Sequence, residues 1–113
     1  MLDMPTVTTP HFTISALETP NGVLRVKLSG DVDMSVGDAL SDALRTAART
    51  PDVSQVVVDL ADTRFLDSHG VAGLVDGYES ATSAGRRFTV INGHGLVQQV
   101  LDITGLSEVF CAP

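Results

Sequence analysis

The stretch from residue 55 to residue 83 constrains the fold most, because its apolar pattern changes period within a few residues. It begins with three consecutive valines, Val56 to Val58, and an unbroken apolar run is typical of a central strand buried on both faces. Beyond Ser68 the apolar residues recur at helical spacing, at Val71, Leu74, Val75 and Tyr78. The pattern predicts a strand over Gln55 to Leu60, a loop, and a helix from Ser68 to about Ser83.

Ser68 stands where this helix begins, and we interpret it as the N-cap. A hydroxyl at that position lies beside backbone N–H groups that have no intrahelical partner, in the positive field of the helix dipole. The position would therefore tolerate an added phosphate. The alternative is purely structural, because serine is a preferred N-cap wherever a helix starts. Asp-Ser-x-Gly by itself does not decide between the two.

The composition indicates one compact domain. The chain has 113 residues, 43% of them hydrophobic, and we expect a flexible arm over residues 1–10 followed by a single domain over 11–113. Cys111 is the only cysteine, which excludes an intrachain disulfide and fits a reducing compartment. The start of the chain carries no signal-peptide pattern, and the longest apolar run is too short to span a bilayer. We therefore expect a cytoplasmic protein.

The charge balance bears on the choice of partner. Fourteen acidic residues stand against seven basic ones, and the formal net charge is −7. Nucleic acid and anionic membranes are disfavoured as partners, because both attract clustered Lys and Arg. The nearest basic cluster is Arg86-Arg87, which we place at a helix-to-strand turn. A protein with a basic contact surface is the better expectation.

The remaining pattern alternates strands and helices. Strands are expected over His11 to Leu17 and Val23 to Ser29, joined by the hairpin turn Asn21-Gly22. A first helix is expected from an N-cap at Ser35 to about Thr50-Pro51. The later elements are a strand over Phe88 to Ile91, a helix opened by Gly93-His94-Gly95, and a short last strand containing Val109 and Phe110. Phe65, Tyr78, Phe88 and Phe110 are expected in the core or at its edge.

This order predicts an α/β fold. We expect a mixed four- or five-stranded sheet, in which the later strands run parallel through right-handed crossovers, with the helices packed mainly on one face. No internal repeat or linker interrupts the pattern.

Three motifs together resemble the STAS domain of the bacterial anti-sigma factor antagonists. They are Gly30-Asp31-Val32-Asp33 after the second strand, Phe65-Leu66-Asp67-Ser68-His69-Gly70 at the second helix, and Asp102-Ile103-Thr104-Gly105-Leu106 at the end of the third. The resemblance spans residues 11 to 110, and the middle motif is the most specific. The chain departs from the family in having His69 where many relatives have Ser or Thr, and relatives usually continue into a further helix beyond the position of Pro113.

The resemblance implies a switch at Ser68. In the family, the unphosphorylated antagonist binds an anti-sigma factor serine kinase, with ATP bound by that partner, and frees a sigma factor. Phosphorylation of the serine ends binding, and a metal-dependent Ser/Thr phosphatase restores it. By this resemblance Asp67 helps to set the geometry and charge around the Ser68 hydroxyl, and Asp31, Asp33, Asp67, His69 and Gly70 belong to the partner-binding surface. For His69 the favoured alternative is a solvent-facing ring in the first turn of the helix.

Other classes of function fit the sequence less well. An enzyme is disfavoured because Ser68 and His69 are helix neighbours that do not face each other, and no Gly-x-Ser-x-Gly elbow is present. The three histidines lack metal-ligand spacing, so neither a metal nor a cofactor is expected. A small-ligand or nucleotide-binding module, and a STAS scaffold without a phosphorylation switch, remain as alternatives.

Overall fold

The computed structural model describes residues 7–9, 12–19 and 21–110, with the backbone alone for residues 7–9. Within the expected N-terminal arm, Val7–Thr9 forms a short strand, and His11 and Cys111 lie outside the described residues. The strands are β1 (Val7–Thr9), β2 (Phe12–Glu18), β3 (Val23–Val32), β4 (Gln55–Leu66) and β5 (Arg87–Ile91). The helices are α1 (Gly37–Ala48), α2 (Ser68–Ser83), α3 (Gly95–Ile103) and α4 (Leu106–Phe110).

The five strands form one mixed sheet in the order β1-β2-β3-β4-β5. β1, β2 and β3 pair antiparallel, whereas β3, β4 and β5 pair parallel. The β2–β3 hairpin turns at Gly22, whose φ of 77° requires a residue that tolerates the left-handed region. The predicted mixed sheet is confirmed.

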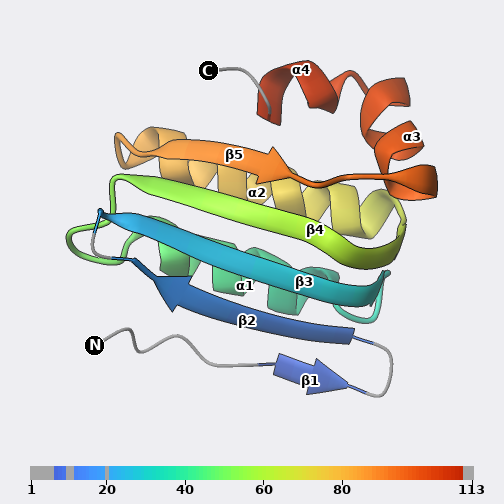
Figure 1. Ribbon diagram of the computed structural model, residues 1–113, viewed down its shortest axis with the longest axis horizontal. Coiled ribbons are helices and arrows are strands. Elements are labelled where there is room, and N and C mark those ends of the chain that lie inside the picture. Colours follow the sequence, from blue (N-terminus) through green and yellow to red (C-terminus); the bar gives the residue numbers. More distant parts are fainter. Residues whose placement is uncertain (1–6, 10–11, 20, 111–113) are drawn as a thin grey trace.

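Helices α1 and α2 lie behind the sheet, while α3 and α4 lie beyond the edge formed by β5 (Figure 1). The layering follows from the alternation of β3, in which Leu24, Val26 and Leu28 are fully buried toward the helices. The intervening Arg25 and Lys27 are exposed on the opposite face. The expectation that the helices pack mainly on one face is therefore confirmed.

Three local predictions were wrong. Val109 and Phe110 belong to helix α4 rather than to a strand, because Gly105 turns the chain with a φ of 76° and Phe110 is then buried against Tyr78 and Phe88. The N-cap of α1 is Val36 rather than Ser35, whose hydroxyl instead donates to Asp33 Oδ1. Phe65 is 44% exposed, whereas Tyr78, Phe88 and Phe110 pack together as expected.

Candidate functional site

Strand β4 extends to Leu66, six residues beyond its predicted end, and is irregular as it approaches the start of α2. Its pairing with β3 shifts twice, once between Lys27 and Ser29 and again between Gly30 and Asp31. At each shift β4 contains one more residue than β3. An extra residue of this kind bends the strand that carries it and increases its twist. The buried Thr63 Oγ1 donates to the carbonyl oxygen of Leu28 at 2.8 Å, which ties the strands between the two shifts. Side-chain hydrogen bonds as well as backbone pairing therefore fix the course of the chain from β4 into α2.

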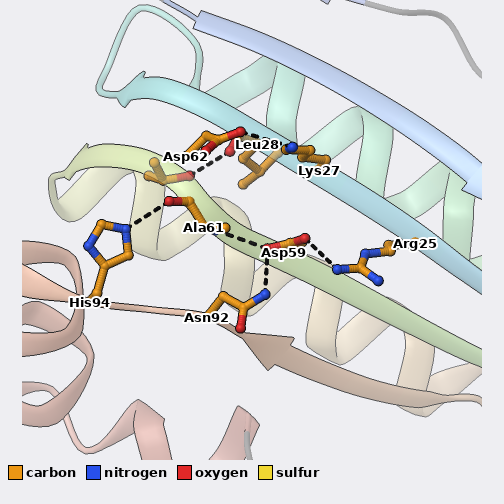
Figure 2. Close-up of polar contacts among 9 residues, drawn as sticks. Arg25, Lys27, Leu28, Asp59, Ala61, Asp62, Asn92 and His94 are labelled. Atoms are coloured by element: carbon orange, nitrogen blue, oxygen red, sulfur yellow. Dashed lines mark hydrogen bonds and ion pairs between the residues drawn. The ribbon is translucent and has the colours of Figure 1, made fainter.

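Asp59 anchors the first irregularity (Figure 2). The residue is only 4% exposed, and its carboxylate accepts from Arg25 Nη2 at 2.6 Å, from Asn92 Nδ2 at 3.0 Å and from the Ala61 N–H at 2.9 Å. Burial alone would raise the pKa of Asp59. The hydrogen bonds from Arg25, Asn92 and Ala61 outweigh that effect and lower the pKa to about 2. Asp59 is therefore a charged and hydrogen-bonded group at the first irregularity of the strand that leads to Ser68.

Sequence reasoning missed this network, although a signal for it was present. Asp59 directly follows the three valines of a buried strand, and a carboxylate in such a place needs partners. Around it, Lys27 Nζ lies 2.9 Å from Asp62 Oδ2, and His94 Nε2 lies 2.8 Å from the carbonyl oxygen of Ala61. These groups join β3, β4 and the segment after β5 on the face that carries Arg25 (Figure 2).

The N-cap of α2 is Asp67, so the prediction that Ser68 caps this helix was wrong. Asp67 has the extended backbone of a cap, and its Oδ1 accepts from the N–H groups of His69 at 2.9 Å and Gly70 at 3.0 Å. Asp and Ser are comparable caps, and the residue with the extended conformation takes the role. Ser68 is then the first helical residue, with its side chain exposed.

The first turn of α2 packs closely against the end of β3 and the start of α1. The Asp67 N–H donates to the carbonyl oxygen of Val32 at 3.2 Å. A Cβ built on Gly70 would lie 2.7 Å from the Val32 carbonyl oxygen, and one built on Gly37 would lie 3.3 Å from the carbonyl oxygen of His69. Gly70 is buried and allows this approach, which brings the loop after β3 beside Ser68.

The two acidic residues of the first motif lie at the end of β3 (Asp31) and in that loop (Asp33). Asp33 Oδ1 accepts from the Ser35 N–H at 2.9 Å and from the Ser35 hydroxyl at 2.5 Å, which shapes the turn into α1. Asp31 Oδ1 lies 3.7 Å from Arg64 Nη2, an exposed pair of little energetic weight. Asp31 also stands opposite Phe65 in the β3–β4 register. The predicted site residues are therefore grouped at one end of the β3–β4 pair.

Two exposed apolar side chains accompany them. Met34, in the loop after β3, is 69% exposed, and Phe65, at the end of β4, is 44% exposed. With Asp67, Ser68 and His69 they form what we call the Ser68 surface. Sequence reasoning did not assign Met34, although an apolar residue between Asp33 and Ser35 in a polar turn was a usable signal. This surface therefore contains a carboxylate, a hydroxyl group and two exposed apolar side chains.

Within the described ranges, no group of three His, Cys, Asp or Glu side chains could hold a metal ion. Among the helices of residues 7–9, 12–19 and 21–110, none is long and apolar enough to cross a membrane.

The sequence matches the family described as Mlab, STAS domain over residues 15–111. It is 27% identical over 93 residues to the anti-sigma F factor antagonist of Paenibacillus polymyxa, covering 82% of this chain and 80% of that protein. An anti-sigma factor antagonist from Mycobacterium paratuberculosis is similar in structure, with a TM-score of 0.78 and 27% identity over 92% of this chain and 87% of that one. Unphosphorylated SpoIIAA, an anti-sigma factor antagonist, shares the fold with a TM-score of 0.73 and 18% identity over 83% and 82% of the two chains. The chain therefore belongs to the STAS domain family and is similar to its anti-sigma factor antagonists.

Proposed function

We propose that this protein is an anti-sigma factor antagonist controlled by phosphorylation of Ser68. In the unphosphorylated state it binds an anti-sigma factor serine kinase and thereby releases a sigma factor. The observation that carries the proposal is the exposed Ser68 hydroxyl on the first residue of α2, beside two exposed apolar side chains. The similarity to anti-sigma factor antagonists supports it, and SpoIIAA among them has both an unphosphorylated and a phosphorylated form.

The Ser68 surface supplies two kinds of contact. Met34 and Phe65 offer apolar area of the type that forms the centre of protein interfaces. Asp31, Asp33 and Asp67 surround it with negative charge, which favours a partner with a basic contact surface. His69 is the exposed residue of this surface that follows Ser68, and the buried Gly70 lets the first turn of α2 lie against β3.

Phosphorylation would act across the interface rather than by unfolding the site. Asp67 already occupies the N–H groups of His69 and Gly70, so a phosphate on Ser68 adds its charge beside a carboxylate. That charge is about −1.5 to −2, and at a helix N-terminus it does not melt the helix. Repulsion and loss of fit that cost about 3 kcal/mol would weaken the complex roughly a hundredfold.

The proposal assigns the chemistry to the partners. The kinase binds the ATP and transfers the phosphoryl group, and a metal-dependent Ser/Thr phosphatase removes it. The antagonist itself acts as a regulator in the cytoplasm, without catalysis and without contact to nucleic acid or membrane. Its net charge of −7 agrees with a protein partner rather than a polyanion.

Binding of two variants to the candidate kinase tests the proposal. Ser68→Ala should retain binding, whereas Ser68→Asp should lose it, because the added carboxylate lies inside the contact. Ser83→Asp is the matched control, since Ser83 is an exposed serine at the other end of α2 and its variant should bind normally. Equal binding by Ser68→Ala and Ser68→Asp would favour a scaffold without a switch and overturn the proposal.

A further inference from the structure

A second site lies at the far end of α2 from Ser68, where Arg86 and Arg87 share a pocket of about 220 Å³. Helix α2 and helix α4 both run alongside β5 here (Figure 1). The side chains of Tyr78, Thr82, Phe88 and Val109 form its walls, and none of the described residues that line it is acidic. The pocket thus combines two cations, hydroxyl groups and apolar surface.

Arg86 and Arg87, like Arg49, make no ion pair among the residues that the structure describes, but only their pocket is lined by two arginines and by no acidic residue. Arg25, Lys27, Arg45 and Arg64 each lie within ion-pair distance of an aspartate. The Arg86 guanidinium donates from Nη1 to the Val53 carbonyl oxygen, but its Nε is buried without a hydrogen-bond acceptor. A buried donor on a charged group without an acceptor is costly, so the interactions of the Arg86 guanidinium within the described residues are incomplete.

The backbone fixes this pair in place. The Arg86 N–H donates to the Ala81 carbonyl oxygen at 2.8 Å, and the Arg87 N–H donates to the Ser54 carbonyl oxygen at 3.0 Å. The two acceptors lie in the last turn of α2 and directly before β4, so the backbone from which the two side chains extend is fixed. Binding of an anion therefore requires ordering of the arginine side chains but not of the backbone.

We propose that this pocket binds a small organic phosphate monoester. The two arginines that line the pocket supply positive charge for a dianion with several acceptor oxygens, and the Thr82 hydroxyl adds a further donor. The rings of Tyr78 and Phe88, 6.0 Å apart and nearly perpendicular, together with Val109, offer a wall for the apolar body of the ligand. The site is separate from the Ser68 surface, so it does not depend on the phosphorylation switch.

Amide chemical shifts of the protein, titrated with phenyl phosphate at constant ionic strength, test this site. We expect saturable shifts centred on Thr82 and on Arg86 to Phe88, with binding at least tenfold weaker for phenol, which lacks the phosphate. Arg87→Gln should raise the Kd at least tenfold, since the exposed Arg87 side chain makes no ion pair within the described chain. Val109→Asp, which adds a carboxylate to the wall, should also weaken binding.

Arg49→Gln is the matched control, because Arg49 is exposed and borders a different pocket that also contains Asp76 and Glu79. It removes the same charge and should leave the Kd within twofold of the parent value. Equal weakening by Arg49→Gln and Arg87→Gln would reduce the effect to net charge and overturn the proposal. Absence of saturable shifts at millimolar phenyl phosphate, or tighter binding of benzoate than of phenyl phosphate, would overturn it as well.

Discussion

At the scale of single residues, the start of α2 separates two roles that the sequence had combined in Ser68. Asp67 satisfies the orphan N–H groups, and the Ser68 hydroxyl is left exposed. A serine used as a cap would have its oxygen committed to the backbone. The division therefore leaves the hydroxyl accessible to a modifying enzyme while the helix remains capped.

Replacement of the cap should cost more stability than replacement of the serine. Asp67→Ala removes the acceptor of two hydrogen bonds, and we expect it to lower the free energy of unfolding by about 0.5–2 kcal/mol. Ser68→Ala should change it by only a few tenths of a kcal/mol, as for other exposed positions. Urea denaturation of both variants measures the difference. A larger loss for Ser68→Ala than for Asp67→Ala would contradict this assignment of the cap.

Asp59 should give the protein a pH-dependent stability. Its pKa is about 2 in the folded state against an ordinary value of 3.8, so the folded state favours the charged form. This contribution, about 2 kcal/mol, is present above pH 3.8 and is lost as the pH falls toward 2. The difference in unfolding free energy between the parent protein and Asp59→Asn should therefore be largest near neutral pH and shrink below pH 4.

Denaturant unfolding at several pH values between 7 and 2 checks this expectation. Arg25→Gln serves as the partner variant, because it removes the ion-pair partner 2.6 Å from Asp59 and should weaken the same pH dependence. A difference between the parent protein and Asp59→Asn that stays constant down to pH 2 would show that Asp59 is not held in its charged form.

At the scale of elements, α2 owes its position to glycines on one side. Gly70, Gly73 and Gly77 are all buried, and they let the helix approach β3 and α1 closely. Glycine lowers intrinsic helix propensity by about 1 kcal/mol relative to alanine, so their presence here reflects packing rather than helix formation. The closeness of α1 and α2 is also what brings the loop after β3 beside Ser68.

Replacement by alanine should affect stability differently at Gly73 and at Gly77. A Cβ on Gly77 would lie 2.6 Å from Leu44 Cδ1 and 2.7 Å from Leu44 Cβ, which cannot both move away easily. We expect Gly77→Ala to destabilise the protein by about 1 kcal/mol or more despite the gain in propensity. Gly73→Ala, whose nearest contact is Leu40 Cδ2 at 3.0 Å, should be much closer to neutral. Thermal unfolding compares them, and equal stabilisation by both would contradict this packing.

The elements also show where sequence reasoning holds and where it stops. Periodicity alone located α1, α2 and the buried strands, because burial of one face of an element dictates the spacing of its apolar residues. It failed at α4, where Phe110 is buried against Tyr78 and Phe88, a contact distant in sequence that no local pattern announces. It likewise ended β4 at Leu60, because the bulges beyond that point depend on Asp59, Thr63 and their partners on other strands.

The same limit applies to the candidate site. Asp67 and Ser68 could be placed at a helix start from sequence, but which of them caps the helix depends on backbone angles. The grouping of Asp31 and Asp33 with Ser68 follows from the parallel pairing of β3 with β4, which the order of elements predicted. Met34 and Phe65 became candidates only when their exposure was known.

At the scale of the whole molecule, the chain has two chemically different ends. The Ser68 surface is acidic and apolar, whereas the pocket at Arg86 and Arg87 contains unpaired cations, as judged within the described residues. Helix α2, sixteen residues or about 24 Å long, separates them. A protein partner for the first and a small anion for the second are the assignments that this distribution of charge favours.

The central claim is that Ser68 is the residue modified by the partner kinase. The most direct measurement is intact mass and phosphosite mapping after incubation of the protein with ATP and an anti-sigma factor kinase, with Ser68→Ala as the control. We predict one added phosphate on Ser68, absent from the control and accompanied by loss of kinase binding. Phosphate at another residue, an equal mass increase in Ser68→Ala, or no modification by a kinase that binds the protein would contradict the account.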